Sequence, residues 1–158
     1  MKSADLFGEP GIETLLEVLR NERSILGRLN LQLSEAGFLV RASLDRFLVL
    51  AADDIGYLEA ELGELEMLRA IIVAGVASGL GVPGRDLSLA EIITRVEPKY
   101  RDLLVRELEL LRHLTIEIAR AKDSISSLAA DRLAATRTAI SELADVPAEA
   151  SERARGAE

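Results

Sequence analysis

The chain has 158 residues, enough for one domain, with a formal net charge of -8 at pH 7, 49% hydrophobic residues and only 3% aromatic residues. This composition predicts an aliphatic core, and the absence of cysteine excludes disulfides, thiolate zinc sites and cysteine nucleophiles. The acidic excess argues against binding to nucleic acid or to an anionic membrane surface, because phosphate recognition requires clustered cations.

Residues 1–10 are expected to form an irregular N-terminal lead that Pro10 and Gly11 close. The lead contains no apolar run of the length that a secretory signal needs. The longest apolar stretch, residues 71–80, is half of the about 20 residues that span a bilayer. We therefore expect a cytoplasmic protein without a membrane span.

Two long helices are predicted before residue 79, because apolar residues recur there at gaps of three and four. The first helix runs to about Arg41, and Ser43 is the expected N-cap of the second, which runs to about Ser78. The first stripe consists of Ile12, Leu15, Leu19, Leu26, Leu29, Leu33, Ala36 and Val40, and the second of Leu44, Leu48, Ala51, Ile55, Leu58, Leu62 and Leu65. The small residues between the stripes predict a tight antiparallel hairpin.

A loop and a short helix are predicted next. Three glycines and a proline between residues 79 and 84 form the strongest helix-breaking cluster of the chain. Ser88, followed three residues later by Glu91, matches a capping box, in which each side chain accepts a hydrogen bond from a backbone N–H of the first turn. The short helix is expected over residues 89–96.

The last helix is predicted from Lys99 to about Leu143, because Pro98 is tolerated in a first helical turn and Pro147 ends any continuation. Its apolar residues are Leu104, Leu108, Leu111, Leu114, Ile118, Ala121, Ile125 and Leu128, followed at looser spacing by Leu133, Ile140 and Leu143. The polar tail 145–158 is expected to be disordered. The predicted fold is all-α: one domain over residues 11–144, an elongated antiparallel bundle of three long helices with one short helix between the second and third.

Neither catalysis nor metal binding is indicated. His113 is the only histidine, so a di-metal bundle site lacks its second histidine and a solvated side chain is expected. Gly79, Gly81 and Gly84 spell GxGxxG, but a helix precedes them instead of the strand that a dinucleotide site requires. The acidic residues of the second helix are expected to be a solvated face: Asp53, Asp54, Glu59, Glu61, Glu64 and Glu66. We predict no enzyme, no cofactor and no metal.

One charge interrupts the apolar stripe of the first helix. Glu22 stands where the spacing requires an apolar side chain, and a buried carboxylate is costly unless it is paired. We predict a structural ion pair with Arg112 or Arg120 on the last helix. A role of Glu22 in recognition is the alternative.

Several apolar residues fall outside the main stripes: Phe38, Phe47, Val49, Leu50, Val73, Val105, Leu110 and Ile116. They indicate helices that are apolar on more than one face. One interpretation is that the three long helices cover these faces for one another. The other is an open groove into which an amphipathic helix of a partner docks.

The order of the elements and three segments resemble the flagellar type III export chaperones of the FlgN family. The segment ETLLEVLRNERSILGRL is similar to that family's first helix, with Glu22 at a recurring acidic position. The segment LEAELGELEMLRAIIVAGVASGLGVP is similar to its second helix and the turn that follows, with Arg69 at the family's arginine, and LSLAEIITRV resembles its short capped helix. The resemblance covers about residues 11–144.

This resemblance implies a cytoplasmic chaperone of bacterial flagellum biogenesis that acts in type III protein export. It would hold the C-terminal amphipathic helical segment of hook-associated proteins soluble, by helix packing without ATP or covalent chemistry. The export apparatus is a further candidate partner. The implied client-binding surface lies on the second half of the last helix, with Ile125, Leu128, Ala129, Leu133, Ile140 and Leu143 as candidates. We expect this alanine-rich region to be the most mobile part of the free protein and to become ordered on binding.

The alternative function is a coiled-coil-like scaffold or adaptor, which uses the same stripes to form a homodimer or to bind another amphipathic helix. Stripes that continue without interruption over the whole length would favour it. Glu22 and the loop at residues 79–84 interrupt them here.

Overall fold

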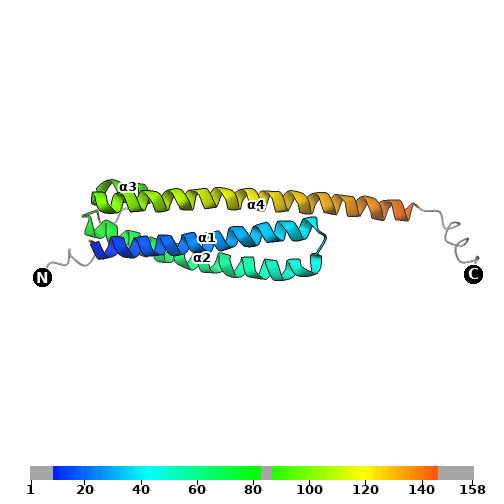
Figure 1. The fold of residues 1–158 in the computed structure, drawn as a ribbon, viewed down its shortest axis with the longest axis horizontal. Helices are drawn as coiled ribbons and strands as arrows, with labels where there is room; N and C mark the ends of the chain where they lie inside the picture. Colours follow the sequence, from blue (N-terminus) through cyan, green and yellow to red (C-terminus); the bar gives the residue numbers. More distant parts are fainter. Residues whose placement is uncertain (1–8, 83–86, 146–158) are drawn as a thin grey trace, which may run out of the picture.

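The computed structural model describes residues 9–82 and 87–145, and four α-helices make up nearly all of that part of the chain (Figure 1). The helices are α1 (Glu9–Arg41), α2 (Asp45–Gly79), α3 (Leu89–Arg95) and α4 (Pro98–Ala144). The described residues contain no strand. The predicted all-α bundle of three long helices, with a short helix between the second and third, is confirmed.

The first helix is the centre of the bundle. It packs against α2, which runs antiparallel to it, and against α4, which runs parallel to it (Figure 1). No Cα atom of α2 lies within 8 Å of one of α4, so both backbones lie closest to α1, and α2 and α4 meet only through side chains, such as the pair of Lys122 with Glu59. Leu16, Val18 and Ile25 are buried in addition to the predicted stripe, and α1 therefore has the two apolar sides that a central helix needs.

Most of the core lies at the α3 end of the molecule. The buried cluster there combines α1, the end of α2, α3 and the start of α4, with Leu15, Leu19, Ile92 and Leu104 almost inaccessible to solvent. The capping box is confirmed: Ser88 Oγ accepts a hydrogen bond from the Glu91 N–H, and Glu91 accepts one from the Ser88 N–H. A helix of only seven residues needs this cap and this packing, because it is too short to be stable alone.

A second, smaller cluster continues the core toward the α1–α2 turn. Its buried members are Ile25, Leu29, Leu33, Leu58 and Ile118, contributed by α1, α2 and α4. The parallel register of α1 and α4 is fixed by polar contacts as well: the Tyr100 hydroxyl donates to Glu13 Oε1 at 3.3 Å, and Asn30 Nδ2 donates to Glu117 Oε2 at 3.2 Å.

The predicted N-cap at Ser43 is wrong. Leu44 stands at the N-cap position of α2 without a side-chain cap, and Ser43 has a φ of 57°, in the left-handed region. The Leu44 N–H donates to the Leu39 carbonyl at 3.0 Å and the Ser43 N–H to the Val40 carbonyl at 3.2 Å. These two bonds are the Schellman pattern, so Ser43 ends α1 at the position that glycine usually occupies.

The remaining boundaries differ from the predictions by one or two residues. The first helix begins at Glu9, so Pro10 lies in its first turn and not in an irregular lead. The backbone N–H that proline lacks would have no partner in a first helical turn, so proline is tolerated there. The rest of the predicted lead, residues 1–8, lies outside the described residues, as does the predicted disordered tail after Asp145. No helix in the described ranges combines the length and the hydropathy that crossing a membrane requires.

Candidate functional site

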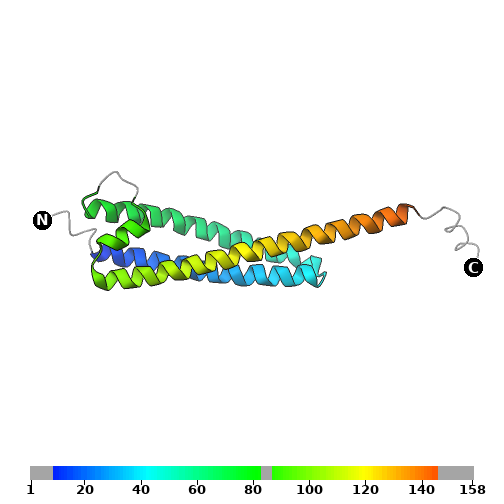
Figure 2. The ribbon, with the colours of Figure 1, turned by 90° about the horizontal axis from the view of Figure 1, so that it is seen from above.

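The last helix projects from the bundle. It has 47 residues, whereas α1 has 33 and α2 has 35, and it continues well past the α1–α2 turn (Figures 1 and 2). Arg132 on α4 pairs with Asp45, the first residue of α2, through two bonds, of which Nη2–Oδ2 measures 2.7 Å. This pair marks the level at which α4 leaves the hairpin, and every described residue from 133 to 145 is exposed.

The six residues predicted to bind a client divide at this level. Ile125 is half-buried and packs against the smaller core cluster, Leu128 is half-buried, and Ala129 is exposed. Leu133, Ile140 and Leu143, on the projecting part, have side chains that are 51%, 61% and 74% exposed. The structure therefore leaves the outer three without a cover among the described residues, while Ile125 already contributes to the core.

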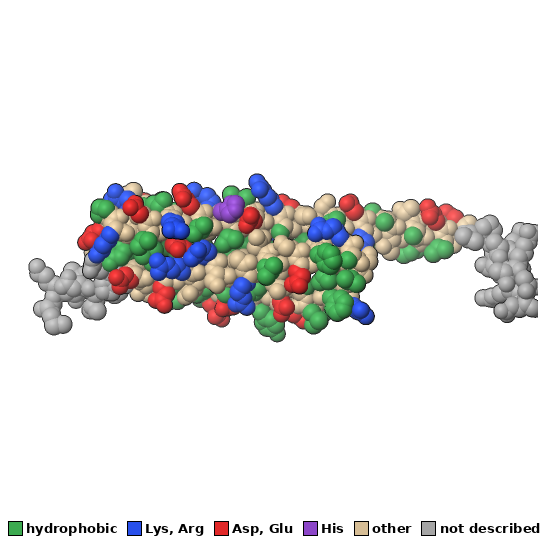
Figure 3. Space-filling model, viewed as in Figure 1, with side chains coloured by type: hydrophobic (Ala, Val, Ile, Leu, Met, Phe, Trp, Pro, Cys, Tyr) green, Lys and Arg blue, Asp and Glu red, His purple; other side chains and the backbone are tan. Residues whose placement is uncertain are grey.

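The end of the hairpin near the projection is also apolar. Phe38 near the end of α1, and Phe47, Val49 and Leu50 near the start of α2, are all exposed. Figure 3 shows hydrophobic side chains gathered around this end of α1 and α2. The interpretation that the three long helices cover one another's extra apolar faces is wrong for these residues, because all four side chains are exposed.

Two other predicted extra apolar residues behave differently from these. Val73 on α2 is half-buried against the larger core cluster, and Leu110 on α4 is half-buried. Val105 and Ile116 on α4 are exposed. The extra apolar face of α4 is thus largely solvent-accessible along its length.

Glu22 is buried and paired, but not with the predicted partners. Its side chain is 2% exposed, and its Oε2 accepts a hydrogen bond from Arg69 Nη1 of α2 at 2.8 Å. Arg112 and Arg120 are exposed on α4 and make no ion pair with Glu22, so both predicted pairs are wrong. The reason is geometric: Glu22 lies on the side of α1 that faces α2.

Arg69 is the partner of Glu22 that the pairing prediction missed. It lies four residues after Leu65, which is the next position of the α2 apolar stripe. One charge in each of two stripes that pack antiparallel was the signal that could have identified the pair.

Only one of the two carboxyl oxygens of Glu22 accepts a hydrogen bond within the described residues. Its Oε1 is buried and has no hydrogen-bond partner among the described residues. Burial raises the pKa of Glu22, the Arg69 guanidinium lowers it, and the neighbouring Glu66 raises it again, with a net increase above the ordinary value. A group that is destabilised in its charged form by the fold and yet lines a surface groove is a functional candidate.

That groove lies between α2 and α4, with α1 as its floor. It has a volume of about 390 Å³. Its lining residues are Glu22, Leu26 and Leu29 from α1, Glu59, Leu62, Gly63, Glu66 and Arg69 from α2, and Leu111, Thr115, Ile118 and Lys122 from α4. Lys122 Nζ lies 2.6 Å from Glu59 Oε1, so one ion pair bridges the two walls. The groove has the Glu22–Arg69 pair at one end and the Glu59–Lys122 pair at the other, with apolar side chains between them.

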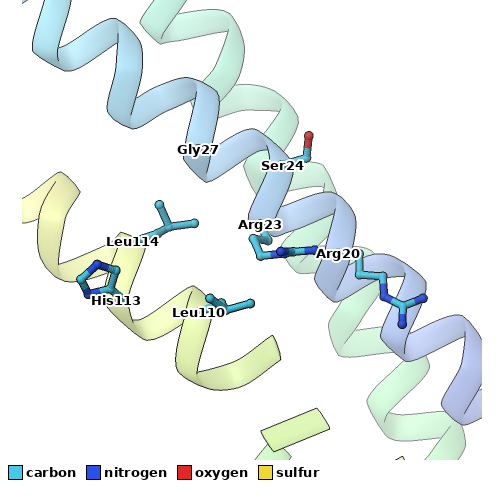
Figure 4. Close-up of a pocket in the computed structure, with 7 residues that line it drawn as sticks. All are labelled: Arg20, Arg23, Ser24, Gly27, Leu110, His113 and Leu114. Carbon is cyan, nitrogen blue, oxygen red and sulfur yellow. The ribbon is translucent and has the colours of Figure 1, made fainter. Parts of the chain in front are cut away.

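A shallower pocket of about 480 Å³ lies where α1 and α4 meet (Figure 4). Arg20, Arg23, Ser24 and Gly27 line it from α1, and Leu110, His113 and Leu114 line it from α4. Nε of Arg23 lies 3.0 Å from one oxygen of the buried Glu107, and Nε of Arg20 lies 3.7 Å from the other. The two guanidinium groups of α1 thus neutralise the buried carboxylate of Glu107, and these ion pairs join α1 to α4.

The histidine, the acidic residues and the glycine motif considered from the sequence do not form a catalytic or metal site in the part of the chain that the structure describes. His113 is exposed and lies 3.4 Å from Glu117, one turn later on the same helix. The predicted acidic face of α2 is exposed. Across residues 9–82 and 87–145, no three His, Asp or Glu side chains come close enough together to hold a metal ion. Of the glycine motif, Gly79 ends α2 and Gly81 has a φ of 78° in the following turn, while Gly84 lies outside the described residues.

The chain matches no protein-family model, no curated protein and no solved structure. Any functional conclusion therefore depends on the residues described above.

Proposed function

We propose that the chain is a helix-binding chaperone, of the kind that the flagellar export chaperones of the FlgN family represent. Its client would be the C-terminal amphipathic helical segment of a hook-associated protein, held soluble by packing without catalysis. The observation that supports the proposal is the projecting part of α4, which carries Leu133, Ile140 and Leu143 away from the bundle in an exposed state.

The spacing of these three residues suits a helical partner. Leu133 and Ile140 are two turns apart, and Leu143 follows almost one turn later, so all three lie on one side of α4. An amphipathic helix of a client can lay its own apolar stripe along this side. The same contact removes from water both the apolar side of α4 and the apolar stripe of the client. Covering the client's stripe in this way would prevent its aggregation.

The expected affinity is modest. Complete burial of a Leu or Ile side chain contributes about 1.5–3 kcal/mol, so three of them contribute at most about 4–9 kcal/mol before the costs of association. A dissociation constant near 1 μM requires about 8 kcal/mol. Since the costs of association reduce this sum, we expect these three residues to support binding weaker than about 1 μM, which permits release of the client.

Calorimetric titration with C-terminal peptides of hook-associated proteins from the same genome tests the proposal. The test variant replaces Leu133, Ile140 and Leu143 by serine. The matched control replaces Leu103, Val105 and Ile116, which are exposed apolar residues on the bundle part of the same helix, by serine. We expect binding that the test variant loses and the control variant retains.

Two results would reject the chaperone proposal. The first is the absence of binding with every peptide. The second is a concentration-dependent homodimer in light scattering that the test variant abolishes, since this result would support the alternative, a scaffold built from the same projecting stripe.

A further inference from the structure

We infer that the outer side of α2, which faces away from α1, is a docking surface for a basic amphipathic helix of another protein. This side carries a second apolar stripe, with acidic residues along its first half and no charge along its second half. It is separate from the projecting part of α4. The inference therefore goes beyond the proposed function and can fail without it.

The outer stripe has the spacing of a helix-packing surface. Its positions follow one another at gaps of three and four, on the side of α2 opposite the stripe that α1 covers, and all six are exposed: Tyr57, Ala60, Glu64, Met67, Ile71 and Ala74. The large apolar members Tyr57, Met67 and Ile71 are 76%, 69% and 69% exposed. At the rise of an α-helix the stripe is about 25 Å long, the length of a partner helix of about five turns.

No described residue covers this side of α2. Figure 1 shows α2 at the edge of the bundle, and it packs against α1 along its length and against α3 near its end. It is nevertheless the most hydrophobic of the three long helices and the least amphipathic. A helix that is apolar on all sides is normally buried, and a continuous exposed apolar patch usually marks an interface. The composition of α2 is thus that of a helix with a neighbour on both sides.

The spacing of the stripe indicates that this neighbour is a helix. In a pair of packed helices, residues three and four apart meet the partner in successive turns. Tyr57, Met67 and Ile71 would project into such a partner. The two small residues of the stripe, Ala60 and Ala74, would leave room for side chains of the partner.

The charges of α2 favour a basic partner. The helix has seven acidic residues and two arginines, so its net charge of -5 is more than half of the -8 of the whole chain. Glu64 lies within the stripe and Asp53 lies one turn before Tyr57, and neither has a cation within 4 Å among the described residues. A lysine or arginine on the docked helix would pair with these two carboxylates.

The two arginines of α2 do not compensate for the acidic half of the stripe. Arg69 lies on the opposite side of the helix and pairs with Glu22. Arg46 lies two turns before Asp53, and its guanidinium carbon is 4.6 Å from the centre of the Phe47 ring. A docked helix would therefore meet carboxylates along the first half of the stripe and only apolar side chains along the second.

A second copy of the chain fits this surface less well. Its own α2 would bring the same carboxylates, and it would place Glu64 against either another acid or the apolar half of the stripe. Both arrangements cost free energy, because the charge loses water without gaining a counter-charge. A helix with lysines beside one half of its apolar stripe avoids this cost and covers Met67 and Ile71 with the other half.

Two synthetic helical peptides of about 18 residues test the inference, with binding followed by fluorescence anisotropy. Both have a leucine stripe at gaps of three and four. The first has lysines beside one half of the stripe, and the second has glutamates at the same positions. We expect the lysine peptide to bind the wild-type chain at least about tenfold more tightly than the glutamate peptide.

One pair of variants tests the apolar half of the surface. Met67→Ser with Ile71→Ser should weaken binding of the lysine peptide at least about tenfold, because two largely exposed apolar side chains lose their contact with it. Val105→Ser with Ile116→Ser is the matched control, since both residues are exposed on α4. It should change binding less than about threefold.

A second pair of variants tests the acidic half. Asp53→Asn with Glu64→Gln should reduce the preference for the lysine peptide at least about fivefold. Asp102→Asn with Glu109→Gln removes the same number of charges from exposed positions of α4 and should reduce the preference less than about twofold. This control separates a local pairing from a general attraction of cations to an acidic chain.

The inference is overturned if the lysine peptide does not bind, if both peptides bind equally, or if either test pair behaves like its control. A homodimer in light scattering that Met67→Ser with Ile71→Ser abolishes would also overturn it, because the occupant would then be a second copy. The serine variant of Leu133, Ile140 and Leu143 should bind the lysine peptide as the wild type does. Loss of binding there would reject the α2 surface and leave the proposed function intact.

Discussion

Replacing Arg69 by Met tests how the buried Glu22 carboxylate is tolerated. Methionine keeps most of the apolar stem of the arginine but removes its hydrogen bond to Glu22 Oε2, at 2.8 Å, so neither carboxylate oxygen keeps a donor among the described residues. Removing one partner of a buried ion pair costs about 3–5 kcal/mol. Because the Arg69 side chain is 36% exposed and the groove admits water, we expect a loss of about 2–3 kcal/mol near neutral pH.

The pH dependence of this loss has a definite sign. Burial raises the pKa of Glu22 in the folded state, and Arg69 opposes that increase, so removing Arg69 raises the pKa further. A group with a raised folded-state pKa stabilises the fold below its unfolded pKa, and this contribution is lost as the pH rises through the folded pKa. The destabilisation by Arg69→Met should therefore be larger at about pH 8 than at about pH 5.

Urea denaturation followed by far-UV circular dichroism measures these differences. Arg28→Met is the matched control, because Arg28 joins the same two helices through an exposed ion pair with Glu61 at 3.8 Å and should change stability by less than about 1 kcal/mol. The double variant Glu22→Leu with Arg69→Met should recover most of the loss, since an apolar pair carries no buried charge. The reasoning is refuted if Arg69→Met costs no more than Arg28→Met, or if its cost does not grow with pH.

Three further predictions concern the helix ends. Ser43→Gly should raise the free energy of unfolding by up to about 1 kcal/mol in urea denaturation, because glycine adopts the left-handed φ of 57° without strain; a lower stability would contradict the Schellman assignment. Ser88→Ala should cost about 1 kcal/mol in the same assay by removing the cap of α3, and an unchanged midpoint would show that the cap is dispensable. Hydrogen exchange of the free protein should be fastest in α4 beyond Arg132, and strong protection there would count against the exposed state of this segment.

The sequence predicted the helices well because each helix buries a stripe at a spacing that is visible in the chain. It did not predict which helix is central. The pairs of adjacent apolar residues Leu15–Leu16, Val18–Leu19 and Ile25–Leu26 widen the stripe of α1, and they were the sign that α1 has a neighbour on each side. Without that observation, two interpretations of the extra apolar residues stayed open: mutual coverage by the three long helices, or an open groove.

The candidate site was predicted only in part for a related reason. The sequence shows directly which residues of α4 have apolar side chains. Whether Leu133 or Ile125 is buried, however, depends on where the α1–α2 hairpin ends beside α4. Likewise, the burial of Glu22 followed from its place in a stripe, whereas its partner depended on which side of α1 faces α2. Pairings between helices are set by packing, and one sequence read along its length does not contain them.

The two surfaces differ in what they can distinguish. The projecting part of α4 offers Leu133, Ile140 and Leu143 and, in the part of the chain that the structure describes, no buried polar group beside them, so it would accept apolar stripes with little selectivity. The groove between α2 and α4 instead carries a charged pair at each end, Glu22 with Arg69 and Glu59 with Lys122, so a partner there would meet charges as well as apolar side chains. The fold keeps a destabilising charge at Glu22 that a leucine would avoid. A buried charge of that kind is tolerated because Arg69 pairs with it, and removing either partner alone leaves the other without its counter-charge.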